Sequence, residues 1–348
     1  MTSKAAISSG WKPVSSGRLR QNRAFWLAVM VAVLGLLVAA SLLIGTRAVS
    51  LADVTGALAG RAETIGEAVV TMRIPRTALA LLAGAALGLS GALMQGMTRN
   101  PLADPGIFGV NMGASLAVVI GVAWFNIASS NAYIWSAIFG AGGTAVFVYT
   151  IGSLGRGGAT PLKLTLAGAA TSIAFASLVI AVVLPRGDIA GGIRSWQIGG
   201  VGGATFERIL PVLPFLAVGL VLALVSARKL NAMALGDELA AGLGENVAIG
   251  RAVAALSAVL LCGAITAVCG PIGFVGLVVP HVCRLLIGVD HRWLLPFSAL
   301  SGAALLLASD IVGRIAARPG EVDVGIITAL VGGPFFIWIV RRQKVREL

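Results

Sequence analysis

The sequence offers few side chains for acid-base, nucleophilic or metal chemistry. Asp310 and Arg314 stand four residues apart at the end of an apolar run, a spacing that places both on one helix face, so we expect a structural ion pair. His281 follows Pro280 and has only His291 near it, so a hydrogen-bonded structural histidine is favoured over a ligand or a base. No Ser/His/Asp, HExxH or paired-carboxylate arrangement occurs. We therefore predict no catalytic residue, no metal site and no enzyme activity in this chain.

The sequence also lacks a nucleotide-binding motif. The sequence has no GxxxxGK[ST] segment, the loop whose backbone amides hold nucleotide phosphates, so any ATP and Mg²⁺ must be held by another subunit. Cys262, Cys269 and Cys283 lie in apolar stretches without CxxC spacing. We expect buried, reduced thiols and no bound cofactor.

One polar stretch, residues 230–245, lies between two long apolar runs and is too short and too polar to cross a bilayer. After Gly236, the acids Asp237 and Glu238 stand where a helix would begin, which suits the positive end of the helix dipole. Two glycines then provide a stop signal, Gly242 and Gly244. The stretch therefore predicts a short helix in water.

An apolar ridge runs along this predicted helix. Leu235, Leu239 and Leu243 recur every four residues and would share one face. Such a ridge can dock in the groove of another protein. The alternative is a connecting helix that rests on the membrane surface.

Two short polar segments flank the first long apolar run after residue 70. Before it, Arg73 and Arg76 surround Pro75; they could form a ring of interfacial side chains, or bind carboxylates of a partner through paired hydrogen bonds. The residues alone leave both interpretations open. After it, residues 99–106 read RNPLADPG, and their two prolines predict a rigid corner.

The composition places these segments in a membrane protein. The chain has 57% hydrophobic and 11% charged residues, outside the ranges of soluble domains, and its mean hydropathy is +0.95. Its 46 glycines predict close helix packing, and Gly84/Gly88 and Gly109/Gly113 have GxxxG spacing. The net charge of +12 is explained by basic residues on the cytosolic side, so we predict no nucleic-acid partner.

Hydropathy predicts an all-α polytopic protein with about ten spans. The expected spans are 26–45, 77–95, 107–124, 132–152, 164–184, 209–226, 249–269, 273–287, 293–313 and 324–340. The charge bias places both termini in the cytosol, with 1–25 as a cytosolic N-terminal segment, 26–341 as the transmembrane domain and 342–348 as a cytosolic tail; the first span, 26–45, is expected to be an uncleaved anchor.

Several segments together resemble the FecCD/BtuC family, the permease subunits of type II ABC importers for ferric siderophores, haem and cobalamin. The resemblance covers nearly the whole chain from Arg73 onward and rests on motifs at 73–95, 99–115, 195–200, 230–244, 270–292 and 308–336. It implies a BtuC-like fold of ten transmembrane helices per subunit, two such subunits around a central path, and two ATPase subunits below. One departure is Asp323, where many relatives have proline.

The resemblance also implies roles for particular residues. The stretch 230–245 corresponds to the coupling helix that contacts the ATPase. Arg73, Arg76 and Arg314 would receive acidic residues of a periplasmic or lipid-anchored binding protein. Thr160 and Pro161 align with the region that narrows the cytosolic exit.

We therefore expect a ferric-siderophore permease, most like the catecholate type, in the bacterial cytoplasmic (inner) membrane. The expected partners are a cytosolic ATPase dimer, a second permease subunit identical or related to this one, the binding protein and membrane lipid. A haem or cobalamin permease is the alternative within the family. A proton- or sodium-coupled carrier is the alternative from another class, but it would need mid-membrane carboxylates that the sequence does not supply.

Overall fold

The computed structural model describes residues 23–127, 129–154 and 160–342, and these residues form helices and no strand. A helix lies at each of the ten expected spans. These helices are α1 (Arg23–Leu43), α3 (Ile65–Thr98), α4 (Val110–Phe125), α5 (Ser130–Ser153), α6 (Pro161–Val183), α9 (Leu213–Met233), α11 (Val247–Cys269), α12 (Val275–Ile287), α13 (His291–Ala316) and α14 (Val324–Arg342). Seven of the helices described are long and apolar enough to cross a membrane, and α4, α12 and α14 are shorter apolar helices.

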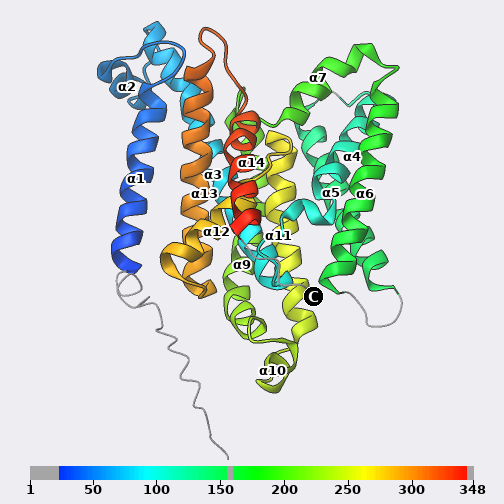
Figure 1. Cartoon of the computed structure of the whole chain (residues 1–348). Helices are drawn as coiled ribbons and strands as arrows, with labels where there is room; N and C mark the ends of the chain where they lie inside the picture. Colours follow the sequence, from blue (N-terminus) through cyan, green and yellow to red (C-terminus); the bar gives the residue numbers. More distant parts are fainter. Residues whose placement is uncertain (1–22, 128, 155–159, 343–348) are drawn as a thin grey trace, which may run out of the picture.

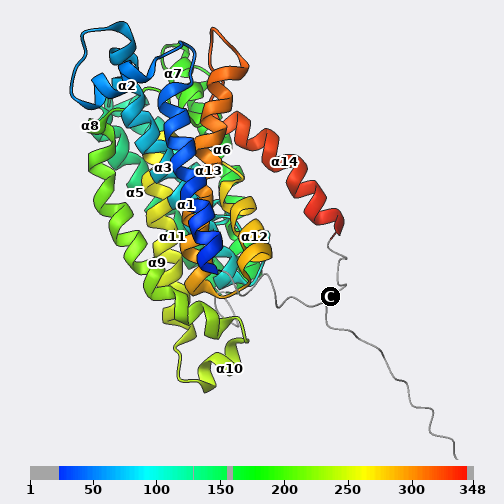
Figure 2. The same ribbon diagram turned by 90° about the vertical axis from the view of Figure 1, so that its left-hand side faces the viewer.

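Short helices lie at both ends of this bundle (Figures 1 and 2). Their bounds are α2 (Leu51–Leu58), α7 (Gly187–Ile198), α8 (Phe206–Ile209) and α10 (Asp237–Gly242), with 3₁₀ turns at η1 (Pro105–Phe108) and η2 (Leu210–Val212). Helices α2 and α7 lie at one end, which we call the α2 end, and α10 projects from the other, the α10 end (Figure 1).

Helix α3 differs from the expected span because it begins at Ile65, well before residue 77. Its start is a capping box: Thr64 Oγ1 accepts from Glu67 N at 3.1 Å, and Glu67 Oε2 accepts from Thr64 N at 3.1 Å. The helix continues through Pro75 for 34 residues, about 50 Å. Arg73 and Arg76 therefore lie inside a helix, one turn apart, rather than in a segment before it.

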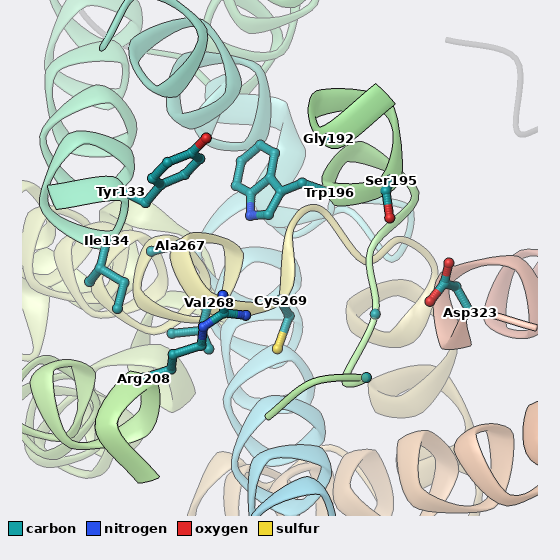
Figure 3. Close-up of a pocket in the computed structure, with 12 residues that line it drawn as sticks. Tyr133, Ile134, Gly192, Ser195, Trp196, Arg208, Ala267, Val268, Cys269 and Asp323 are labelled. Carbon is teal, nitrogen blue, oxygen red and sulfur yellow. The ribbon is translucent and has the colours of Figure 1, made fainter. Parts of the chain in front are cut away.

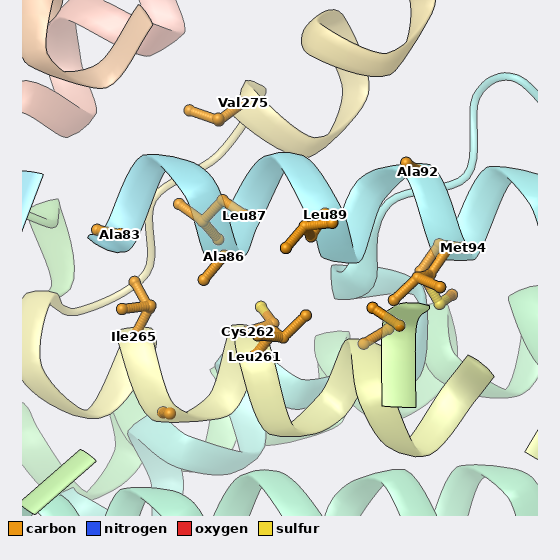
Figure 4. Close-up of a cluster of buried hydrophobic side chains, with 14 of the residues drawn as sticks. Ala83, Ala86, Leu87, Leu89, Ala92, Met94, Leu261, Cys262, Ile265 and Val275 are labelled. Atoms are coloured by element: carbon orange, nitrogen blue, oxygen red, sulfur yellow. The ribbon is translucent and has the colours of Figure 1, made fainter. Parts of the chain in front are cut away.

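The core forms around α3, which packs against α13, α11, α12 and α9. Figure 4 shows small and branched side chains of α3, among them Ala86 and Leu89, on the side that faces Leu261 and Ile265 of α11. Helix α1 lies at the edge of the bundle, with Ser41 as its one buried residue. Cys262, Cys269 and Cys283 are buried free thiols, as predicted.

Helices α3 and α13 approach each other closely in the core, and this contact confirms the packing role of Gly84 and Gly88. A β-carbon at Gly84 would overlap the carbonyl oxygen of Gly302, and one at Gly88 would overlap that of Ser298. Only residues without a side chain allow the two backbones to approach this closely.

We predict that Gly88→Ala destabilises the protein by about 1–3 kcal/mol, because the added methyl group would push α13 away from α3. Gly35→Ala is the matched control, since a β-carbon at Gly35 meets nothing within 4 Å. Thermal unfolding in detergent or nanodiscs should show a lower midpoint for Gly88→Ala and an unlowered midpoint for Gly35→Ala. Equal midpoints for both variants would contradict the assigned contact.

Candidate functional site

The predicted short helix in residues 230–245 is present as α10. It starts at Asp237 after Gly236, whose φ of +111° favours glycine, and it ends at Gly242. Leu235, Leu239 and Leu243 are 60%, 62% and 67% exposed in the single chain. The apolar ridge therefore faces away from the bundle, as the four-residue spacing predicts.

The opposite face of α10 is bound to the bundle. Ala240 is fully buried, and the carboxylate of Asp237 accepts two hydrogen bonds from Arg251 Nη2, each of 2.9 Å. Arg99 Nη2 lies 3.2 Å from Asp237 Oδ1. We call Asp237, Arg99 and Arg251 the Asp237 cluster. Sequence reasoning did not find it, because the two arginines come from separate helices and no local spacing connects them to the acid.

Arg99 belongs to the corner at residues 99–106, which is structured as predicted. Arg99 ends α3 in a left-handed conformation with φ of 53°. The Asn100 side chain accepts from Leu102 N at 3.0 Å, and the Asp104 side chain accepts from Gly106 N at 2.8 Å. These bonds fix the direction in which Arg99 leaves α3 and so hold its guanidinium near α10.

At the α2 end, charged residues from α3, α13 and the following loop form a second cluster. Arg314 Nη2 lies 2.8 Å from Asp310 Oδ2, which confirms the predicted ion pair. Arg76 Nη2 donates to Asp310 Oδ1 at 2.7 Å, and Arg76 Nη1 donates to Glu321 Oε2 at 2.6 Å. With Arg73, these residues form what we call the arginine network.

The remaining arginines of the network bind the end of α1. Arg73 donates to the carbonyl oxygens of Leu42 and Arg47 at 2.8 and 2.9 Å. Arg314 donates to the hydroxyl of Ser41 at 2.6 Å. Arg73 is 6% exposed and Arg314 is 2% exposed, so neither offers a free guanidinium to a partner in this arrangement. Arg76 is connected to the surface through Glu321, and the docking role of the three arginines stays a prediction.

A cavity of about 380 Å³, lined by both polar and apolar residues (Figure 3), lies beside α7, toward the α2 end. Trp196, from the motif at 195–200, and Asp323, at the start of α14, both line it, so the structure brings together two segments that the sequence singled out separately. Tyr133, Arg208 and Cys269 line the same cavity, and nothing in their local sequence indicated this.

The two histidines lie in contacts that indicate a structural role. His281 contacts Phe335 edge-on, with ring centroids 6.0 Å apart. His291 is buried, and its Nδ1 lies 2.9 Å from Asn231 Oδ1. Within the described ranges, no group of three His, Cys, Asp or Glu residues is placed to hold a metal ion.

The predicted gate lies at the start of α6. Thr160 Oγ1 accepts from Lys163 N at 3.4 Å and caps the helix, and Pro161 occupies its first turn. Residues 155–159, directly before them in the sequence, lie outside the described residues. The gate role of Thr160 and Pro161 stays a prediction.

Comparison with known proteins gives one consistent family. The model of the FecCD transport family matches residues 32–342. The ferric enterobactin transport system permease protein FepD of Escherichia coli (strain K12) is 41% identical over 330 residues, which cover 94% of this chain and 98% of FepD. The probable siderophore transport system permease protein YfiZ of Bacillus subtilis (strain 168) is 43% identical over 271 residues, which cover 78% of this chain and 81% of YfiZ.

Comparison of the fold with solved structures gives the same kind of protein as the sequence comparison. A solved structure of a metal-chelate type ABC transporter in an inward-facing conformation superposes with a TM-score of 0.80 at 29% identity, over 92% of this chain and 99% of that one. The predicted resemblance and fold class are thereby confirmed. Matched along almost its whole length in sequence and in architecture, the chain belongs to the FecCD transport family.

Proposed function

We propose that this chain is the permease subunit of an ATP-binding-cassette importer for ferric siderophores and forms part of the path through which they cross the membrane. The observation that supports this most strongly is the near full-length similarity to a ferric enterobactin permease. The exposed leucine ridge on α10 supports it independently, because a subunit that lacks a nucleotide loop needs a surface that binds an ATPase.

The proposed assembly divides the work among subunits. An ATPase dimer holds ATP and Mg²⁺ and binds at the α10 end, which faces the cytosol. A second permease subunit, identical or related, completes the path, and a periplasmic or lipid-anchored binding protein delivers the cargo at the α2 end. Both termini face the cytosol of a bacterium whose inner membrane lipids surround the bundle. Residues 1–22 and 343–348 of the two terminal segments lie outside the described residues.

Transport follows from movement of α10. When ATP closes the ATPase dimer, the grooves that hold the leucine ridges of the two permease subunits move, and the helices attached to α10 move with them. The path then opens alternately toward the binding protein and toward the cytosol. Chemistry at the bond level stays with the ATPase, and this chain supplies the docking surface and the path.

At the α2 end, the binding protein docks on the exposed edge of the arginine network. Arg76 and Glu321 lie at this edge, so a carboxylate of the binding protein can compete with Glu321 for Arg76. The buried Arg73 and Arg314 would then hold α1 and α13 in position around Arg76. Asp323 lies close by, at the rim of the cavity lined by Trp196, where it adds a negative charge near the entrance.

The energy source distinguishes this proposal from an ion-coupled carrier. In proteoliposomes that contain the complete complex and its binding protein, we expect uptake of a radio-iron catecholate siderophore to require ATP and to continue in the presence of an uncoupler. Haem and cobalamin, offered in the same assay, should not be taken up. Uptake that needs only an ion gradient would contradict the proposal. Preferred uptake of haem or cobalamin would show that the substrate is not a ferric siderophore.

A single change on the ridge should detach the ATPase. We predict that Leu239→Asp weakens ATPase binding roughly 30-fold or more, because it places a charge at the centre of an apolar contact and interface anchors of this kind contribute about 2 kcal/mol or more. Copurification of the ATPase from membranes measures this. Leu58→Asp is the matched control, since Leu58 is 64% exposed at the opposite end. Normal copurification with Leu239→Asp would leave α10 as a connecting helix on the membrane surface.

Arg76 should contribute to binding-protein affinity. We predict that Arg76→Gln lowers the affinity for the loaded binding protein, with a larger loss at low salt, where charge attraction is least screened. Arg61→Gln is the control, because the Arg61 side chain is 58% exposed near the same end. Surface plasmon resonance at two salt concentrations measures the effect, alongside thermal unfolding to verify folding. A stable Arg76→Gln protein with unchanged affinity would show that the network is purely structural.

A further inference from the structure

Helix α10 is attached to the bundle by very few contacts. It has six residues, too few for a helix to be stable alone in water. Its leucines face outward, and Ala240 is its one buried residue. A displacement of α10 therefore reaches the membrane helices through its two chain connections, to α9 and to α11, and through the Asp237 cluster, which alone adds a link to the end of α3.

The Asp237 cluster joins α10 to two different helices of the core. Arg251 lies near the start of α11, and Arg99 is the capping residue directly after α3. Figure 1 shows α10 beyond the ends of α9 and α11, at the end of the bundle opposite α2. Asp237 is thus the residue of α10 whose side chain binds both α3 and α11.

Helix α3 extends this connection to the other end of the molecule. Arg99, next to α10, caps the C-terminal end of α3, Arg76 of the arginine network lies within the helix, and between them α3 packs against α13, α11 and α12. Because a helix resists compression along its axis, a push or pull on Arg99 acts on the whole length of α3. Movement at the ATPase surface and movement at the α2 end are in this way connected through one rigid element.

We propose that Asp237 is a positioning residue that transmits the movement of α10 to α3 and α11, and that it is not part of the surface that holds the ATPase. This inference rests on the proposed function. The geometry supports it, because the carboxylate is bound to Arg251 and Arg99 of its own chain while the leucines project toward solvent.

The ion pairs of the cluster are suited to transmission more than to stability. The side chains of Asp237 and Arg99 are each 42% exposed, and half-exposed pairs add little to folding stability. Two arginines on one carboxylate nevertheless fix the direction of α10 relative to two helices at once. Loss of the charge should therefore affect coupling much more than folding or assembly.

The test uses the complete complex in proteoliposomes, with Asp237→Asn compared with the unchanged protein. We expect the ATPase to copurify normally and ATP hydrolysis to stay within about twofold, while siderophore transported per ATP falls about 5-fold to 150-fold, the range of typical coupling free energies. Arg251→Gln and Arg99→Gln should lower the same ratio. Adding Arg251→Gln to Asp237→Asn should cost little more, because both changes break one interaction.

Two further variants separate positioning from a general structural effect. Asp237→Glu keeps the charge and should restore most of the transport per ATP. Glu245→Gln is the matched control, because it is also an acid-to-amide change and lies close to α10 in the sequence. Among the residues that the structure describes, Glu245 forms no ion pair. It should leave the ratio unchanged.

The outcomes are distinguishable. Loss of ATPase copurification in Asp237→Asn would place Asp237 in the docking surface and overturn this inference while leaving the proposed function intact. Unchanged transport per ATP in a stable Asp237→Asn complex would overturn it as well. Absence of ATP-dependent uptake in the unchanged complex would overturn the proposed function, and the inference with it.

Discussion

The backbone contact between α3 and α13 is the constraint on which the rest of this structure depends. Because Gly84 and Gly88 face the carbonyl oxygens of Gly302 and Ser298, the two longest central helices lie close together along much of their length. That approach determines what meets at the α2 end, where Arg76 of α3 reaches Asp310 of α13. Glycine at these positions thus serves the polar cluster as much as the apolar core.

The arginine network shows how this bundle accommodates buried charge. A guanidinium is costly to remove from water unless its donors are bound. Arg73 binds one carbonyl oxygen at the end of α1 and one in the segment that follows, and Arg314 binds Asp310 and the hydroxyl of Ser41. The same Ser41 hydroxyl is hydrogen-bonded to Thr77 Oγ1, 2.7 Å away, and either hydroxyl can be the donor of that bond. Three helices are held at one point by groups that would each be unfavourable alone.

The sequence predicted what depends on local pattern and failed where distant segments meet. Long apolar runs gave the spans, and the glycines and leucines of residues 230–245 gave α10 and its ridge, because each of these depends on residues within one or two turns. The early start of α3 also had a local signal, the capping box at Thr64 and Glu67, which hydropathy ignores because that segment is polar. No local sequence signal indicated the burial of Arg73 or the partners of Asp237. The groups that Arg73 and Asp237 bind come from other helices and from segments not adjacent to them in the chain.

The marginal position of α1 has an evolutionary consequence. Most of its surface faces away from the other helices, and its one buried residue is Ser41, next to Arg314 and Thr77. Apolar side chains on the outward face can be exchanged for one another at little cost, so sequences descended from a common ancestor are free to drift there. Purifying selection on α1 should instead be strongest in its last turn, where a hydroxyl and carbonyl oxygens bind Arg73 and Arg314 in addition to the apolar contacts of residues such as Trp26 and Leu37.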